Sequence, residues 1–378
     1  MLIVSLFYFC AMVNQLKQEK ATDAILLLED GTVFRGKSLG KIGTSGGELC
    51  FNTGMTGYQE IFTDPSYYGQ IVVQTVSHVG NYGVQHGEVE SGKVQIKGLV
   101  CKDFSHHFSR KTAEGSLQEY FEKAGVVGIC EIDTRELVRH IRDKGAMNAI
   151  VSSEITDVHE LQQRLEQVPS MSGLELSSHV STPEEYVVNT ATAKYRIAIL
   201  DLGVKRNSIN NFVQRGCECK VFPYNTPYEE MEKWKPDGYF ISNGPGDPAA
   251  TVAAIESVKK ILAEDRPMFG ICMGHQILAQ ANGIPTYKMH NGHRGLNQPV
   301  KNLLTGKCEV TSQNHGFVVN AEALRNHGEI EVTHINLNDD TIEGIRMKNK
   351  PAFSVQYHPE SSPGPHDSTY LFDDFIAL

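Results

Sequence analysis

From Tyr195 to about residue 283 the chain alternates short apolar segments with amphipathic ones, and this alternation restricts the possible folds more than any other feature. Residues 196–203 (RIAILDLG) have the apolar run of a buried strand, and residues 205–216 have helical spacing. The alternation continues through strand-like residues 219–224, 236–246 and 266–272 and helix-like residues 251–264 and 274–283. Such a pattern predicts an α/β unit, a parallel sheet with helices on both faces.

The preceding part of the chain follows a different pattern. Residues 24–36 read as a strand, an Asp-Gly turn and a second strand, which predicts a β-hairpin. Residues 132–145 have helical spacing, with Asp133 or Thr134 as the N-cap and Gly145 at the end. A polar connector follows at residues 181–195. We therefore expect a separate N-terminal mixed α+β domain at residues 23–190 and the parallel-sheet domain at residues 191–378.

Residues 1–22 form a leader of uncertain role. Residues 2–13 are almost wholly apolar, but a membrane-spanning helix needs about 20 such residues. No basic segment precedes them, as a signal peptide would require. We interpret the leader as a misassigned start or a disordered extension, and we expect no membrane association.

The charge and the cysteines exclude some partners and ligands. The formal net charge is -10, which disfavours nucleic acid as a partner. The eight cysteines form no Cys-x-x-Cys pair, so we predict no metal site and a reduced, cytoplasmic protein.

The segment Gly270-Ile271-Cys272-Met273-Gly274 joins an apolar strand to a helix. It has the form of a nucleophile elbow, a tight turn that needs small flanking residues and lifts one side chain above the sheet. The helix N-terminus favours a thiolate. The alternative is a buried structural cysteine in a glycine-rich turn.

A histidine and a carboxylate follow the last apolar strand. His358 and Glu360 stand at i and i+2, so both can project to the same side of an extended chain. Glu360 could then orient His358, which would accept and return the thiol proton. A surface His/Glu pair is the simpler interpretation in isolation, but the order Cys, His, Glu favours a catalytic triad. The glycine-rich loop 242–248 offers backbone N–H groups for an oxyanion or a carboxylate.

These motifs resemble a known family. The segments ISNGPGDP, FGICMGHQ and YHPE, in this order, are similar to the class I, triad-type glutamine amidotransferases. From about Ala24 onward the chain resembles the small subunits of carbamoyl-phosphate synthase, chiefly through residues 48–67, 78–83, 130–142, 203–209, 312–317 and 354–372.

The resemblance implies a role for eleven residues. The triad would be Cys272, His358 and Glu360. The glutamine and oxyanion contacts would come from Ser66, Gly244, Gly246, Met273 (through its backbone), Gln276, Asn314, Gly316 and Phe317.

The resemblance also implies the reaction and the partner. L-Glutamine would be hydrolysed to glutamate and ammonia, and the ammonia would pass to a large synthetase subunit. That subunit would use ATP, Mg²⁺ and bicarbonate to make carbamoyl phosphate for pyrimidine and arginine biosynthesis. This chain has no P-loop GxxxxGK[ST] motif, so we expect it to bind no cofactor itself. The alternatives are another amidotransferase subunit, a stand-alone γ-glutamyl cysteine hydrolase and a non-catalytic regulatory subunit.

Overall fold

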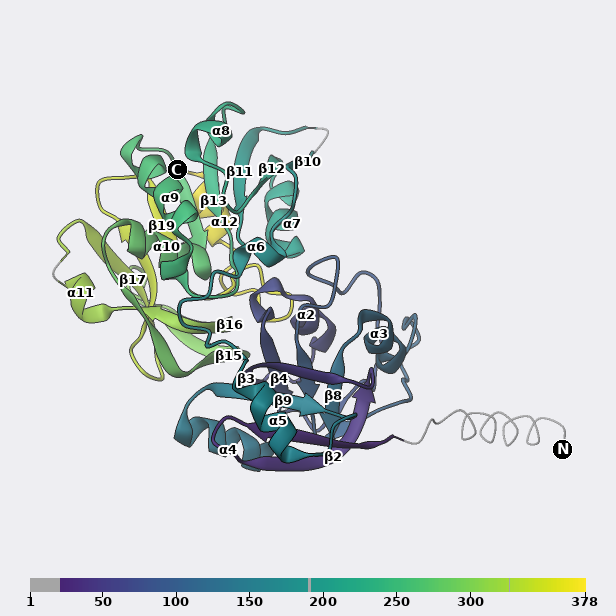
Figure 1. The fold of residues 1–378 in the computed structure, drawn as a ribbon. Coiled ribbons are helices and arrows are strands. Elements are labelled where there is room, and N and C mark those ends of the chain that lie inside the picture. The colour runs from purple at the N-terminus through teal and green to yellow at the C-terminus, as the bar shows by residue number, and fades with distance from the viewer. Residues whose placement is uncertain (1–20, 190–191, 326) are drawn as a thin grey trace, which may run out of the picture.

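The computed structural model describes residues 21–189, 192–325 and 327–378, and it contains two differently built parts (Figure 1). The expected leader lies outside the described residues except for its last two, of which Thr22 donates its backbone N–H to Ser38 Oγ at 3.0 Å. None of the helices within these ranges is both long and apolar enough to cross a membrane.

The N-terminal part is a closed barrel of seven strands in the order β1-β2-β8-β6-β4-β3-β9. Its strands are β1 (Asp23–Leu28), β2 (Val33–Gly40), β3 (Thr44–Asn52), β4 (Gln70–Gln74), β6 (Gly98–Val100), β8 (Val127–Cys130) and β9 (Met147–Ser152). The predicted hairpin is confirmed, because β1 and β2 pair antiparallel up to Leu27 and Val33. The barrel closes where β1 pairs with β9, from Ile25 opposite Ser152 to Leu28 opposite Ala149.

Short helices cover the barrel. They are α2 (Tyr58–Thr63), η1 (Pro65–Tyr67), α3 (Leu117–Ala124), α4 (Thr134–Lys144) and α5 (Val158–Leu165), and β5 (His78–Val79) pairs with β7 (Asp103–Phe104). The short helix α6 (Ser177–Val180) lies instead next to the C-terminal part (Figure 1). The predicted cap of α4 is confirmed: Asp133 accepts a hydrogen bond from Glu136 N, and Gly145 follows the last helical residue. Leu137 and Ile141 of this helix pack into the barrel core.

The C-terminal part is a ten-stranded sheet in the order β10-β12-β11-β13-β14-β19-β18-β17-β15-β16. Its strands are β10 (Tyr186–Val188), β11 (Tyr195–Asp201), β12 (Cys217–Pro223), β13 (Gly238–Ile241), β14 (Met268–Ile271), β15 (Thr286–Asn302), β16 (Cys308–Val319), β17 (Ile330–Asn336), β18 (Ile342–Met347) and β19 (Ala352–Val355). The five central strands β12, β11, β13, β14 and β19 are parallel, as predicted. The other five pair antiparallel, which the alternation of the sequence did not indicate.

Helices lie on both faces of the parallel strands. They are α7 (Arg206–Gln214), α8 (Tyr228–Glu232), η2 (Pro248–Ala250), α9 (Val252–Ala263), α10 (Met273–Ala281) and α12 (Leu371–Ile376). Helix α11 (Ala321–Arg325) lies farther out, beside the antiparallel strand β17 (Figure 1). Alternate residues of β11 enter different cores: Ile197 packs with residues of α7 and α12, and Ala198 with residues of α9 and α10. The prediction of a parallel sheet with helices on both faces is therefore confirmed for this part of the chain.

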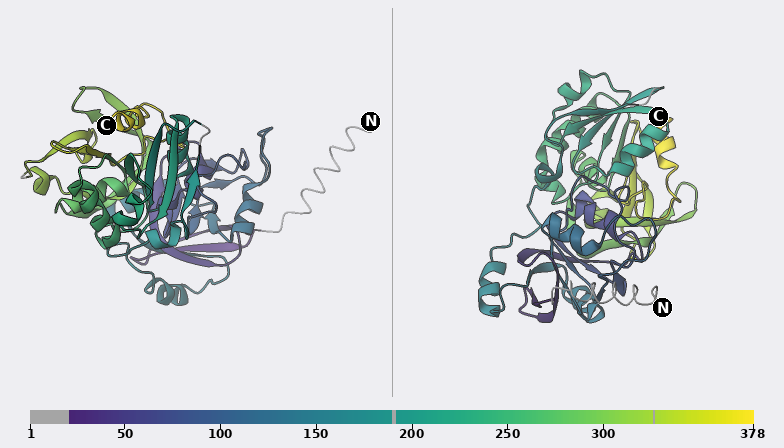
Figure 2. Two further views of the ribbon diagram at one scale, coloured as in Figure 1. Left: turned by 90° about the horizontal axis from the view of Figure 1, so that it is seen from above. Right: turned by 90° about the vertical axis from the view of Figure 1, so that its right-hand side faces the viewer.

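The two parts meet along β15, β16 and the loop that precedes α7 (Figure 1; the two turned views are in Figure 2). Thr53 N donates to Arg294 O at 3.4 Å, and Ala146 N donates to His290 O at 2.6 Å. β10, which precedes the expected domain boundary near residue 190, is one of the two edge strands of the ten-stranded sheet. The domain bounds themselves remain a prediction.

Candidate active site

Cys272 occupies a strained turn between β14 and α10. Its φ of 53° and ψ of -100° lie where side chains are rarely tolerated. Its backbone N–H donates to Val355 O of β19 at 2.9 Å, which holds the turn against the sheet. Cys272 is the N-cap residue of α10, although its thiol makes no capping hydrogen bond. The side chain is almost fully buried, and Sγ lies 3.6 Å from Asn314 O.

The glycines on either side of Cys272 are required by packing. A Cβ on Gly274 would lie 2.1 Å from Ile241 O, and a Cβ on Gly270 would lie 2.7 Å from the backbone of Gly274. Helix α10 therefore approaches β13 more closely than any residue with a side chain allows. The geometry is that of the nucleophile elbow which the sequence predicts.

His358 and Glu360 follow β19 and lie side by side in the interior. Nδ1 of His358 is 2.7 Å from Glu360 Oε1, and both side chains are at most 2% exposed. Nε2 of His358 has no hydrogen-bond partner among the described residues that meets strict geometric limits, and the Cys272 side chain is a neighbouring group that interacts with this imidazole. Burial lowers the pKa of His358, but the carboxylate of Glu360 and the neighbouring Cys272 thiol outweigh it and raise the pKa to about 10.

A buried ammonium stabilises the carboxylate of this pair. Lys205 Nζ lies 3.1 Å from Glu360 Oε1 and donates to Ser361 O at 2.6 Å. Burial raises the pKa of Glu360, but Lys205 and His358 outweigh it and lower the pKa to about 2. Asn207 Nδ2 also donates to the backbone carbonyl of Glu360. Glu360 is therefore ionised and held from two directions.

The predicted substrate contacts converge on one cavity beside Cys272. Its lining includes seven of the eight predicted contacts, namely Ser66, Gly244, Gly246, Gln276, Asn314, Gly316 and Phe317. The eighth, Met273, follows Cys272 directly, and its side chain packs in the apolar core, so only its backbone can face a substrate.

Both parts of the chain contribute to this cavity. Ser66 belongs to η1 on the barrel, and its hydroxyl accepts a hydrogen bond from Asn243 Nδ2 at 2.9 Å. Asp64 Oδ2 accepts from Asn314 Nδ2 at 3.3 Å, again across the junction. Gln276 Nε2 donates to Phe317 O at 2.7 Å and so ties α10 to β16.

Sequence reasoning missed several polar residues of this region. It gave no role to Lys205, Asn207 or Asn243, although the segments GVKRNSI and ISNGPGDP contain them. It also passed over Glu48 and Arg294, two buried charged residues that line the cavity. A buried lysine is a signal only once burial is known, because a lysine in a polar segment is ordinarily solvated.

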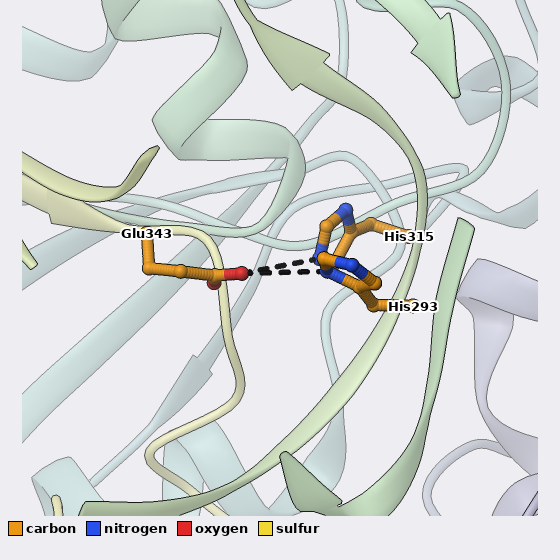
Figure 3. Close-up of side chains that lie close together, drawn as sticks. All are labelled: His293, His315 and Glu343. Carbon is orange, nitrogen blue, oxygen red and sulfur yellow. Dashed lines mark ion pairs between the residues drawn. The ribbon is translucent and has the colours of Figure 1, made fainter. Parts of the chain in front are cut away.

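Within the described residues, one group could hold a metal ion: His293, His315 and Glu343, whose ligand atoms lie within 4.8 Å of one another (Figure 3). Glu343 Oε1 is 3.5 Å from His293 Nδ1, and Asp339 Oδ2 is 2.9 Å from His293 Nε2. Burial lowers the pKa of His293, but Glu343 and Asp339 outweigh it, so the pKa is raised. His293 therefore lies between two carboxyl groups that favour its protonated form.

Known proteins match this chain over nearly its whole length. Residues 26–151 match the family described as carbamoyl-phosphate synthase small chain, CPSase domain, and residues 198–378 match glutamine amidotransferase class-I. The carbamoyl phosphate synthase small chain of Chlorobaculum tepidum is 48% identical over 357 residues, which cover 94% of this chain and 97% of that protein. The small chain of Aquifex aeolicus is 46% identical over 367 residues, which cover 94% of this chain and 98% of that protein. This chain belongs to the family of carbamoyl-phosphate synthase small chains, whose C-terminal part is a class I glutamine amidotransferase domain.

Proposed function

We propose that Cys272, His358 and Glu360 form the triad that hydrolyses L-glutamine to glutamate and ammonia. The observation that carries the proposal is the placement of a buried thiol on a strained turn beside the hydrogen-bonded pair of His358 and Glu360. The family membership of both parts of the chain supports the same reaction.

The reaction begins with attack by the Cys272 thiolate on the side-chain carboxamide carbon of glutamine. Backbone N–H groups of Met273 and of the loop carrying Gly244 and Gly246 stabilise the tetrahedral oxyanion. His358 then gives a proton to the departing nitrogen as the C–N bond breaks, which leaves a γ-glutamyl thioester and ammonia.

A water molecule completes the cycle. His358 accepts a proton from the water as its oxygen attacks the thioester carbon, and the C–S bond breaks to release glutamate. Ser66, Gln276, Asn314, Gly316 and Phe317 position the substrate, and their presence on one cavity wall supports this role.

We further propose that the ammonia serves a large synthetase subunit. That partner would bind ATP and Mg²⁺ and would use bicarbonate, while this chain needs no resident cofactor, because acyl transfer to a thiol requires none. The absence of disulfides among the seven described cysteines supports a reducing, cytoplasmic location.

The test is Cys272→Ala in a complex with the large subunit. We expect glutamine-dependent carbamoyl-phosphate synthesis to be abolished and ammonia-dependent synthesis to continue, because only the ammonia source is lost. A glutamine-driven rate that survives the substitution would show that Cys272 is not the nucleophile. Glutamine hydrolysis by the chain alone distinguishes this function from that of a non-catalytic subunit.

A further inference from the structure

The mechanism above leaves a buried carboxylate of the N-terminal part without a role. Glu90 is 5% exposed and lies between β5 and β6. Its backbone N–H donates to Thr63 Oγ1 at 2.9 Å, so it is anchored to the helix that precedes Asp64 and Ser66. Burying a carboxylate lowers the stability of the folded state, because the group loses its hydration on folding. A buried carboxylate is therefore expected to have partners or a role that offset this cost.

Glu90 forms two hydrogen bonds with the backbone of the loop that carries Lys205. Its carbonyl oxygen accepts from Arg206 N at 2.9 Å, and its Oε2 accepts from Asn207 N at 3.1 Å. Both donors lie at the start of α7, in the C-terminal part. One residue of the barrel therefore fixes two successive backbone groups across the junction.

The same loop leads directly to the triad. Asn207, held by its N–H to Glu90, donates through Nδ2 to the carbonyl of Glu360. Lys205 lies 3.1 Å from Glu360 Oε1, and the charges of Glu360, Glu90 and Asp64 together outweigh the effect of burial and raise its pKa. Glu90 is thus linked to the catalytic carboxylate by a hydrogen-bonded route through Asn207 and an electrostatic one through Lys205.

We propose that Glu90 is a positioning residue for the triad: by holding Lys205 and Asn207, it fixes Glu360 beneath His358. This inference rests on the proposed function. It makes the geometry of the catalytic pair depend on how the barrel is seated against the ten-stranded sheet. Small errors matter here, because a displacement of about 1 Å in a catalytic group can cost about 10²-fold in rate.

The test compares Glu90→Gln and Glu90→Asp with a matched control, Glu88→Gln, in the full chain. Glu88 lies two residues away in the same segment, and both of its oxygens pair with Arg110, at 2.7 and 2.9 Å. Steady-state glutamine hydrolysis gives kcat and KM, and thermal unfolding of each variant reports whether the fold is kept.

We expect Glu90→Gln to lower kcat by about ten-fold or more with little change in KM, because the substrate contacts are untouched while the triad is displaced. Glu90→Asp keeps the charge and should recover part of the loss. Glu88→Gln should resemble the unmodified chain.

A pH profile separates positioning of the triad from a general loss of structure. The charged groups that face Glu90 are Lys205, Asp64 and Glu360. Burial raises the pKa of Glu90 to about 7, so Glu90 gains its negative charge beside Lys205 as the pH rises through 7. The dependence of kcat on pH near 7 should therefore change in Glu90→Gln and stay in place in Glu88→Gln.

A double-substitution experiment tests the route through Lys205. In a Lys205→Met background, Glu90→Gln should reduce kcat by a smaller factor than it does alone, because part of its effect passes through the ammonium.

The inference is overturned if Glu90→Gln leaves kcat and its pH dependence unchanged, or if Glu88→Gln matches its losses. Those results leave the proposed function intact as long as Cys272→Ala is inactive. Survival of glutaminase activity in Cys272→Ala would instead reject the proposed function itself.

Discussion

The backbone of Cys272 is held in a strained conformation at the position where the proposed reaction takes place. A non-glycine residue at φ 53° and ψ -100° costs of the order of 1–3 kcal/mol, so the turn persists only because the surrounding structure enforces it. The enforcing contacts are the hydrogen bond to Val355 and the close approach of Gly274 to Ile241. The strain presents the thiol to His358 at the start of α10.

At the same scale, His358 and Glu360 should differ in importance. His358→Asn removes the group that moves protons and should reduce kcat by about 10²–10⁴-fold. Glu360→Gln removes only the charge that orients the imidazole and should reduce kcat less. Steady-state glutamine hydrolysis by both variants checks the order, and negligible losses in both would contradict the triad.

The sequence predicted the residues that carry recognisable motifs and missed those that act by burial. Cys272, His358 and Glu360 follow strand ends, so their convergence could be expected from the alternation of strands and helices. Lys205 and Asn207 approach Glu360 only because α7 packs against the barrel and the sheet at once. No local pattern marks such a contact, since it joins residues more than 100 positions apart.

At the scale of elements, the contact between α10 and β13 limits what position 274 can hold. Gly274→Ala would place a Cβ 2.1 Å from Ile241 O, so the helix must move away from the strand. We expect a loss of about 1–3 kcal/mol or more in the free energy of unfolding, and a lower kcat because Cys272 moves with the helix. Chemical unfolding and glutaminase assays measure both effects.

Gly328→Ala is the matched control, because a Cβ there has nothing within 4 Å. It should change neither stability nor activity. Equal effects at the two positions would show that the contact with Ile241 is not what restricts position 274.

Helix α10 also carries a histidine that makes stability depend on pH. His275 is fully buried, with Nδ1 2.9 Å from Ser354 Oγ, and burial and His334 lower its pKa to about 3. A group with a depressed pKa stabilises the fold above its unfolded value, about 6.5, and that stability is lost as the pH falls toward 3. His275→Gln should weaken the decline of unfolding free energy between pH 7 and pH 4.5, measured in urea, and an unchanged decline would refute the assignment.

Local patterns predicted the elements better than they predicted the connections between them. The β1/β2 hairpin, the Asp133 cap and the parallel strands followed from turns, caps and periodicity. The closure of the barrel did not, because it depends on the pairing of β1 with β9, more than 100 residues apart. The antiparallel strands β15 to β18 were also missed. Polar residues interrupt the alternation of apolar and polar positions by which a strand is recognised in a sequence.

For the whole molecule, we predict that the chain alone is a slow glutaminase which the large subunit accelerates. The cavity takes Ser66 from the barrel and Gly244 from the sheet part, so a partner that docks against both parts can adjust its geometry. Near-attack distances are about 3–3.5 Å, so a slight shift is enough.

Glutamine hydrolysis should be measured for the chain alone and then with large subunit, ATP and bicarbonate added stepwise. Full activity in the chain alone, unaffected by each addition, would contradict the prediction and favour a stand-alone hydrolase.

The hydrogen bond between Asn243 and Ser66 also restricts how such a protein can evolve. Recombination can exchange whole modules freely only when their functions are self-contained, and here the pocket is divided between two of them. A hybrid that joined this amidotransferase half to the barrel of a distant relative would have an intact triad. The barrel residues that line its substrate cavity, however, would not match the residues contributed by the amidotransferase half. The two halves are therefore expected to accumulate substitutions in concert, as the halves of an obligate pair do, although a single gene encodes both.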